Sequence, residues 1–325
     1  MKKVIIGAVL VLLAAALLLA GAEIYGIGRG EEISISIENG TPAQTVYSIL
    51  KENGVIGSRL LFSVYARSSA SGFNSGRHKF YKHEAYADVV AELLSRGKID
   101  SEVSLTFPEG YELREFADLL EENGVVGASD FIKAANGKFD YDFLPPQGEG
   151  YLEGYLFPDT YTVSPEMSCE DIINMMLRRF GEVYTDEYKA RAKELGMSTQ
   201  EIITLASIIE REAAVDTERP LVASVFYNRL NSDYKYLESC ATVQYVLKER
   251  KDVLSNRDIE IDSPYNTYKY PGLPAGPIAS PGKASIEAAL YPADTDYFYF
   301  VSNGDGTQSF SKTLEEHLNS GVNKK

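Results

Sequence analysis

The chain has 325 residues, of which 44% are hydrophobic and 24% are charged, a balance typical of folded domains rather than disordered polypeptide. Its 47 acidic and 32 basic side chains give a net charge of −15. Nucleic acid is excluded as a partner by this balance, because phosphate binding requires clustered cations. The length allows about two or three domains.

The chain opens with two lysines and an uncharged apolar run at residues 4–22. As a helix this run would span about 28 Å, close to the hydrocarbon thickness of a bilayer. The lysines favour the cytoplasmic side. We therefore expect a cytoplasmic tail at residues 1–3, a transmembrane helix at 4–22 and the remainder outside the cytoplasm. A cleaved signal peptide ending at the A-x-A pattern of residues 20–22 is the alternative.

A strand–helix pattern then occurs twice, near residues 33–57 and 103–127. Each copy has an alternating strand, a glycine turn, an amphipathic helix and an Asn-Gly end. In the first copy, Thr41 is a possible N-cap and Pro42 falls in the first helical turn. The closing stretches, KENGVIG and EENGVVG, match closely. The pattern predicts two copies of one small α+β unit.

The remaining elements follow from local patterns. Helices are expected at residues 86–96 and 168–195, and another begins after Ser198. An irregular edge is expected at 150–162, and a proline-rich irregular stretch of the kind that often shapes a site at 263–282. A terminal hairpin should pair residues 297–302 with 307–311.

The two cysteines and three histidines show no metal-ligand spacing, so we expect neither a metal nor a cofactor. Cys169 and Cys240 lie far apart in sequence. Two unlinked buried thiols are favoured over a disulfide, which an extracytoplasmic location would permit.

Glu210 is the first candidate for acid–base chemistry. Ser198 and Glu201 form a capping-box pattern that predicts a helix start, and apolar residues at helical spacing make this helix largely buried. Glu210 is expected near its middle, where small and apolar neighbours would favour the protonated carboxyl of a general acid. Helical glutamates commonly face water or pair with an arginine instead. Glu212 is a rival on the same helix.

Six long motifs in fixed order resemble the endolytic murein transglycosylases, the YceG-like or MltG family. The motifs are LEGYLFPDTY at 152–161, LASIIEREA at 205–213, VASVFYNRL at 222–230, ATVQY at 241–245, SPYNTY at 263–268 and GLPAGPIASPG at 272–282.

The resemblance implies a mixed α+β fold in three parts. They are an N-terminal transmembrane helix, a LysM-like α+β region at residues 23–145 and a YceG-like catalytic domain at 146–325. It implies a single-pass protein of the bacterial cytoplasmic membrane with its C-terminal domain outside the cytoplasm. The implied partners are peptidoglycan glycan strands, the membrane and peptidoglycan synthases, because family members associate with wall-synthesis complexes.

The implied activity is that of a lytic transglycosylase, a carbon–oxygen lyase. It would cleave MurNAc–GlcNAc bonds within nascent peptidoglycan strands and leave 1,6-anhydroMurNAc ends, acting in wall assembly and ending strand elongation. One carboxyl suffices for this chemistry, because the C6 hydroxyl of MurNAc is an intramolecular nucleophile. The family motif S-I-[IV]-E-[KR]-E places this carboxyl at Glu210.

The family motifs also supply six candidates for substrate contact: Asn228, Thr242, Gln244, Tyr265, Asn266 and Tyr268. Each could instead be a buried residue that holds loops by hydrogen bonds, and Arg229 is more typical of an ion pair. Two positions depart from the commoner family pattern. Cys240 stands where an acidic residue is usual, and Gln308 or Ser309 replaces a histidine.

Two other functions stay open on the sequence. A peptidoglycan hydrolase (a muramidase) would need a second carboxylate, for which Glu153, Asp159 and Asp262 are candidates. A non-catalytic scaffold would bind the wall through the repeated units. Whether these units bind glycan or only orient the catalytic domain is not decided by their pattern.

Overall fold

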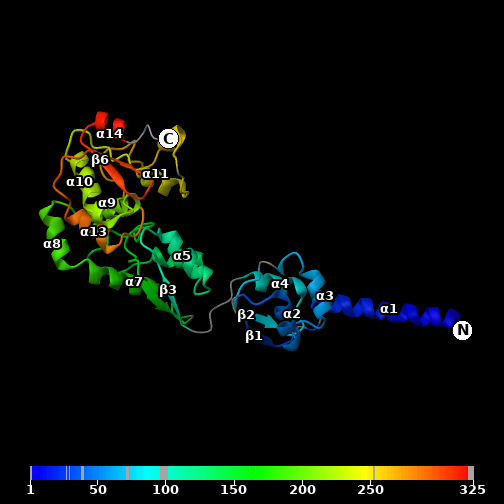
Figure 1. Cartoon of the computed structure of the whole chain (residues 1–325). Helices are drawn as coiled ribbons and strands as arrows, with labels where there is room; N and C mark the ends of the chain where they lie inside the picture. Colours follow the sequence, from blue (N-terminus) through cyan, green and yellow to red (C-terminus); the bar gives the residue numbers. More distant parts are fainter. Residues whose placement is uncertain are drawn as a thin grey trace. The chain divides into compact units, whose positions relative to one another are not determined.

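The computed structural model describes residues 2–26, 28, 30–37, 40–70, 73–95, 102–164, 166–251 and 253–320, without the side chains of 2–9, 12, 13 and 16. The chain forms two compact units (Figure 1). Unit 1 comprises Met1–Val103, Leu120–Gly127 and Val163–Glu166. Unit 2 comprises Ser104–Leu119, Ala128–Thr162 and Met167–Lys325. The sequence-based border after residue 145 therefore differs from the main border of the compact units.

Unit 1 begins with α1 (Lys2–Tyr25), where the transmembrane helix was expected. Part of the 4–22 run has side chains outside the described set. Within that set, we find no helix with both the length and the apolarity needed to cross a bilayer. The end of α1 is attached to the unit, because the Tyr86 hydroxyl donates to Glu23 Oε2 at 2.7 Å.

The rest of unit 1 packs three helices on a two-stranded antiparallel sheet. Its elements are β1 (Glu32–Ile37), α2 (Ala43–Glu52), α3 (Arg59–Tyr65), β2 (Gly76–Tyr81) and α4 (Tyr86–Leu94). These confirm the expected strand and both expected helices. The N-cap of α2 is Pro42 rather than Thr41, because Pro42 is the extended residue before the helix. The predicted end of α4 falls partly on residues 96–100, which are not described.

The second strand–helix copy is β3 (Val103–Thr106) followed by α5 (Leu113–Glu122). Left-handed glycines stand at equivalent turns of both copies: Gly40 and Gly54 in the first, Gly110 and Gly124 in the second. Glycine tolerates positive φ because it lacks Cβ. The shared backbone confirms the repeat, although β1 pairs with β2 and β3 with β4 (Thr160–Val163).

In unit 2, α6 (Ala128–Ala135) packs against α7 (Cys169–Val183), and α8 (Asp186–Glu194) follows. The single helix predicted at 168–195 is wrong, because Tyr184 and Thr185 leave the helical region. The buried ring of Tyr184 stacks on Phe180 at this break.

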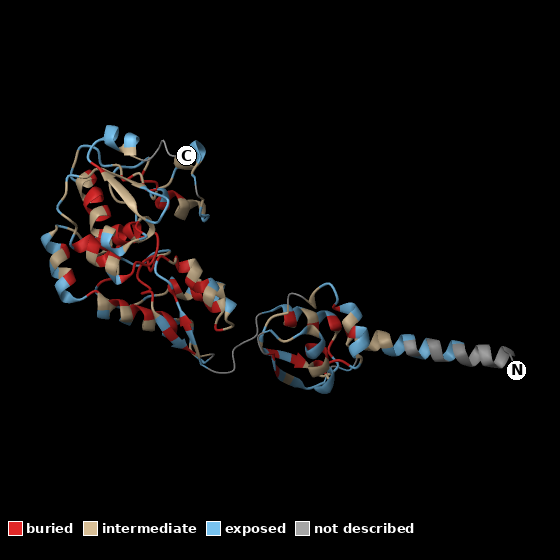
Figure 2. Ribbon diagram, viewed as in Figure 1, coloured by how far each residue is buried: buried red, intermediate tan, exposed pale blue. Residues whose placement is uncertain are grey.

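The centre of unit 2 is α9 (Thr199–Glu212), and Figure 2 shows the surrounding elements as largely buried. The capping box is confirmed, since Ser198 Oγ accepts from the Glu201 N–H and Glu201 Oε2 accepts from the Ser198 N–H. Helix α9 packs against α10 (Arg219–Leu230), α11 (Cys240–Leu247) and α13 (Lys283–Leu290). It ends at Glu212, so Glu210 lies in the last turn and not near the middle.

The other elements complete unit 2. A short 3-10 turn, η2 (Asp216–Glu218), precedes α10, and α12 (Asn256–Ile259) follows α11. Residues 263–282 contain no helix or strand, as predicted. The terminal hairpin is confirmed as β5 (Tyr299–Ser302) and β6 (Gln308–Ser311), and α14 (Leu314–Ser320) follows.

Candidate active site

Glu210, the predicted catalytic residue, is held by polar contacts to both carboxyl oxygens. Its Oε1 accepts from Arg219 Nη1 at 3.1 Å, and its Oε2 accepts from the Gly282 N–H at 2.9 Å. The side chain is 6% exposed and that of Arg219 is 8% exposed. The expectation of few polar partners is therefore wrong. Arg219 also donates to Ser285 Oγ at 2.8 Å, so the Glu210–Arg219 pair connects the end of α9 to α13.

The carboxyl of Glu109 lies beside these contacts. It lies against Gly282, where a Cβ would overlap this carboxyl unless the Glu109 side chain moved. Partial burial and the negative charge of Glu210 raise the pKa of Glu109. Sequence reasoning did not single out Glu109, because it follows a proline in a loop and belongs to no helical pattern.

Glu212, the rival on the same turn, meets a different environment. Its Oε1 accepts from Ser239 Oγ at 2.6 Å, and the Ala241 N–H also donates to its carboxyl. Burial raises the pKa of Glu212 against these hydrogen bonds. Glu212 therefore has the property that the sequence analysis sought at Glu210, a desolvated carboxyl that favours its protonated form.

Glu212 lines a cavity of about 520 Å³, which we call the Glu212 cavity. Two other residues that line it carry buried polar atoms, Gln308 Oε1 and His317 Nδ1, without a hydrogen-bond partner among the described residues. Buried polar atoms normally have a hydrogen-bond partner, so each of these unpaired atoms needs an explanation, such as a bound ligand that supplies the partner. Gln308 is fixed in place, because its Nε2 donates to the Glu212 carbonyl.

The charged lining of the Glu212 cavity comes from Arg229 and Glu238. Arg229 donates to the carbonyls of Phe298 and Leu237 and pairs with Glu238 Oε2 at 3.3 Å. Its side chain is 9% exposed, which agrees with a mainly structural ion-pair residue. Glu238 is 35% exposed and has a φ of +50°, so it is a second carboxylate at this cavity in a strained backbone position.

Tyr268 is the single predicted substrate residue that lines the Glu212 cavity in the part of the chain that is described. Its hydroxyl lies 3.0 Å from Cys240 Sγ, and Cys240 also lines the cavity. Cys240 and Cys169 are both free thiols in the structure. Cys240 is exposed and Cys169 is half-buried, so the expectation of buried thiols is wrong.

Four of the predicted substrate residues hold loops instead. Asn228 donates to the carbonyls of Thr295 and Tyr297, and Asn266 donates to those of Ile259 and Ile261. The other two bonds are from Gln244 Nε2 to Lys251 O and from the Thr242 hydroxyl to Ser239 O. Both Thr242 and Asn266 are fully buried. These contacts match the structural alternative, and the predicted role of these four in substrate contact stays a prediction.

Tyr265 lines a second cavity of about 490 Å³, together with the buried carboxyl of Glu153. We call it the Glu153 cavity. The other candidates for a second carboxylate, Asp159 and Asp262, line neither this cavity nor the Glu212 cavity. Asp159 pairs with Arg179 at 2.7 Å, and Asp262 pairs with Lys269 at 3.0 Å. Neither aspartate is therefore placed to assist Glu212.

The sequence missed Glu238, Gln308 and His317 as lining residues of the Glu212 cavity. Gln308 was noted only as a departure from a family pattern. His317 lies on α14, outside every motif, and reaches the cavity because α14 packs on the β5–β6 hairpin. No group of three or more His, Cys, Asp or Glu side chains suited to a metal occurs within the described ranges.

Comparison with known proteins agrees with this architecture. The model of the YceG-like family matches residues 35–322. An endolytic murein transglycosylase of Bacillus subtilis is 36% identical over 93% of this chain and 89% of its own length. One of Streptococcus pneumoniae is 29% identical, and the match covers 90% of this chain and 59% of that protein.

A solved structure is also similar. The crystal structure of a yceG-like protein from Listeria monocytogenes is 34% identical, with a TM-score of 0.63 over 89% of this chain and 99% of that one. The family model spans most of the sequence, and the fold of a family member is reproduced. The chain therefore belongs to the YceG-like family.

Proposed function

We propose that this protein is an endolytic peptidoglycan lytic transglycosylase, and that Glu212 rather than Glu210 is its acid/base. The relatives named endolytic murein transglycosylase support the activity. The observation that supports the residue is the Glu212 cavity, with a desolvated carboxyl and two orphaned polar atoms. Glu210 lines neither the Glu212 cavity nor the Glu153 cavity and is bound to Arg219.

The proposed reaction needs only one carboxyl. Protonated Glu212 donates its proton to the glycosidic oxygen between MurNAc and GlcNAc as that bond breaks. The carboxylate then takes the proton of the MurNAc C6 hydroxyl while this oxygen bonds to C1. The product is a 1,6-anhydroMurNAc end, no water is consumed, and Glu212 regains its proton. No second carboxyl is needed, because the intramolecular nucleophile is already positioned at C1.

The orphaned acceptor of Gln308 suits a substrate that carries an amide. Its buried Oε1 has no donor within the described part of the chain, and a small shift of the side chain would present this oxygen to the N–H of an N-acetyl group in the Glu212 cavity. Pairing the two would remove a buried unsatisfied group, which costs about 1–3 kcal/mol when left unpaired. Tyr268 adds an aromatic ring to the same wall, on which a sugar face can pack.

The experiment is a product analysis on intact sacculi with the full chain, Glu212→Gln and Glu210→Gln. We expect anhydro-ended fragments from the parent and from Glu210→Gln but none from Glu212→Gln. Mass spectrometry distinguishes the reactions, since a hydrolytic product is heavier by one water. Cleavage by Glu212→Gln at the parent rate would refute the residue assignment.

A hydrolase is the alternative that one observation favours. Glu238 lines the same cavity as Glu212 and could activate water as a second carboxylate. Its engagement by Arg229 and by the Tyr234 hydroxyl argues for a structural role. Products heavier by one water, lost in Glu238→Gln, would select the hydrolase.

We also propose that α1 anchors the protein in the bacterial cytoplasmic membrane, with the remainder outside the cytoplasm. The support is the uncharged run at residues 4–22 after two lysines, which lies within one continuous helix. Flotation with lipid vesicles tests the anchor. The full chain should float and a chain starting at residue 23 should not.

Residues 23–145 are proposed as a LysM-like region that presents the catalytic domain to nascent strands. The repeated strand–helix units support this proposal, since both have the same glycine turns. Cleavage of nascent strands beside peptidoglycan synthases would end their elongation. Longer glycan strands in cells carrying only Glu212→Gln would support that role, and unchanged strand lengths would oppose it.

A further inference from the structure

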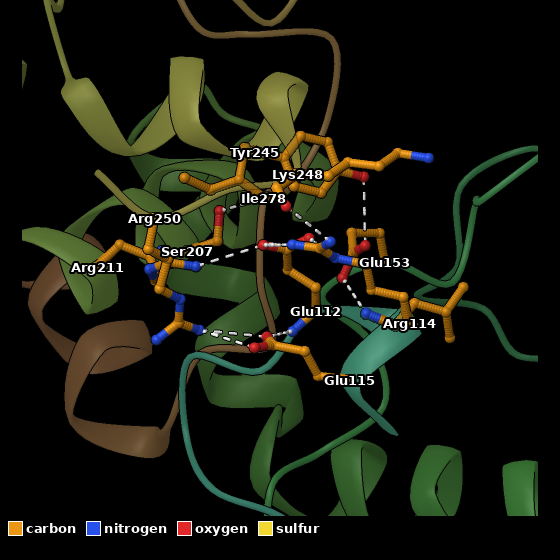
Figure 3. Close-up of polar contacts among 11 residues, drawn as sticks. Glu112, Arg114, Glu115, Glu153, Ser207, Arg211, Tyr245, Lys248, Arg250 and Ile278 are labelled. Atoms are coloured by element: carbon orange, nitrogen blue, oxygen red, sulfur yellow. Dashed lines mark hydrogen bonds and ion pairs between the residues drawn. The ribbon is translucent and has the colours of Figure 1, made fainter. Parts of the chain in front are cut away.

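A second enclosed carboxyl, Glu153, takes no part in the chemistry proposed above. It is 6% exposed. Its Oε1 accepts from the Leu113 N–H at 2.9 Å and its Oε2 accepts from the Tyr245 hydroxyl at 3.2 Å (Figure 3). Burial, and to a smaller extent the charge of Glu112, raise the pKa of Glu153 to about 8. At neutral pH the group is therefore mostly a neutral acid, able to donate as well as accept a hydrogen bond.

The Glu153 cavity is lined by groups that suit a sugar ring. Tyr245 and Tyr265 lie side by side, with ring centroids 4.9 Å apart and planes inclined at 48°. Leu113, Ile132 and Val246 add apolar wall, and its volume is about 490 Å³. Ligand sites for neutral polar molecules combine apolar and aromatic walls with a few fixed polar groups.

The rim of the Glu153 cavity carries an available cation. Arg114 is neutralised by Glu112, with contacts of 2.8 and 3.2 Å, and donates to the Lys248 carbonyl. The Lys248 side chain is exposed and extends away from these ion pairs in Figure 3. Among the described residues, no ion pair is formed by its amine. A carboxylate on a ligand could therefore reach Lys248 without displacing a protein partner.

The two cavities share structural elements. Arg211, adjacent to Glu212 on α9, lies 3.7 Å from the Glu112 carboxylate in the lining of the Glu153 cavity. Helix α11 contributes Cys240 to the Glu212 cavity and Tyr245 to the Glu153 cavity. Five residues along a helix correspond to about 8 Å. Those five positions also turn through about 140°, so Cys240 and Tyr245 lie on different faces of α11, and a glycan strand that occupies both cavities would pass around this helix.

We propose that the Glu153 cavity is a saccharide subsite that binds a sugar of the same glycan strand, away from the bond cut at Glu212. Tyr265 provides the ring against which the sugar packs, Glu153 pairs with a hydroxyl or acetamido group, and Lys248 faces the lactyl carboxylate of a MurNAc that carries no stem peptide. The inference rests on the proposed function, because an enzyme that cuts inside a chain must hold sugars beyond the cut. Binding of such remote units positions the reacting bond.

The test measures affinity against strand length. Peptide-free glycan strands of defined length are titrated calorimetrically into the full chain in detergent, carrying Glu212→Gln to prevent turnover. We expect long strands to bind at least tenfold more tightly than a tetrasaccharide. Adding Tyr265→Ala or Lys248→Asn should remove most of that gain and leave tetrasaccharide affinity unchanged. Tyr265→Phe, which keeps the ring, should retain it.

Lys193→Asn is the matched control, since Lys193 is exposed on α8 and lines neither cavity. If Tyr265→Ala does not fold, Lys248→Asn decides, because its φ of +55° is one that asparagine tolerates. The same length gain in every variant would overturn the subsite, as would a gain seen only with peptide-bearing strands.

The two proposals fail differently. Strand cleavage is measured in parallel with Glu212 intact. A parent that makes no anhydro ends, yet binds long strands in a Lys248-dependent way, refutes the transglycosylase and supports the subsite. A parent that makes anhydro ends with affinity independent of strand length refutes the subsite alone.

Discussion

The two sides of the last turn of α9 differ in what a buried glutamate does there. On one side Glu210 joins Arg219 and the Gly282 N–H and ties α9 to α13. On the other side Glu212 takes two hydrogen bonds from the start of α11 and faces a cavity. Two positions along a helix are separated by about 200° of rotation, so the carboxyls point in nearly opposite directions. A sequence motif that contains both glutamates cannot show which of the two side chains faces a cavity.

The largest expected effect is that of Glu212→Gln. Loss of the only proton donor and acceptor should lower the cleavage rate about 10³-fold, within the range for general acid–base catalysis. Release of anhydro-ended fragments from sacculi measures the rate. Thermal unfolding should show an intact fold, since glutamine still accepts from Ser239. A Glu212→Gln protein that is both folded and active would contradict the assignment of Glu212 as the acid/base.

Glu210→Gln should act on stability instead. Removing one partner of this buried ion pair leaves the guanidinium of Arg219 with the exposed Asp216 as its remaining carboxylate, at a cost of up to about 3 kcal/mol. Chemical denaturation of the full chain in detergent measures this loss. The fraction that remains folded should cleave within tenfold of the parent rate. A stable Glu210→Gln protein without activity would return the acid/base role to Glu210.

Glu153 extends the comparison to a buried carboxyl without a cationic partner. The unfolded group titrates near 4.5 and the folded group at about 8, so between these values only the unfolded state has lost its proton. The free energy of unfolding should therefore fall as pH rises from about 5 to 8. Glu153→Gln should remove on the order of 2 kcal/mol of that fall.

Thermal melts of parent and Glu153→Gln at pH 5 and 8 measure this difference. Asp258 is a contrast at lower pH, because hydrogen bonds from Ser255 and contact with Lys251 lower its pKa to about 2, so its contribution to the free energy of unfolding rises with pH between about pH 2 and 4. Parallel pH profiles for parent and Glu153→Gln would contradict the prediction.

The smallest expected effect is that of Asn228→Ala. It removes two hydrogen bonds to the chain before β5, each with a net contribution of about 1 kcal/mol. The melting temperature should drop by a few degrees, and the KM for glycan strands should stay unchanged. A raised KM with an unchanged melting temperature would make Asn228 a substrate contact after all.

Much of the local structure could be predicted from sequence. The capping box of α9, the glycine turns of both repeats and the terminal hairpin depend on neighbouring residues, so patterns of a few positions define them. The break between α7 and α8 could not be predicted, because no proline marks it; the buried Tyr184 ring there packs on Phe180 and Tyr188. The proposed acid/base, Glu212, lies within one helical turn of the predicted Glu210 but on the other face of that turn.

The sequence by itself determined the family, the repeated units, the buried helix α9 and the two glutamates on its last turn, one of which we propose as the acid/base. Only the tertiary structure decided which glutamate meets a cavity, because Arg219, Gly282 and Ser239 come from segments that the chain order does not place. The same reason explains Gln308 and His317, which reach the cavity through packing of the hairpin and α14. Protonation of a carboxyl depends on what surrounds it in space, and those surroundings form only when the chain folds.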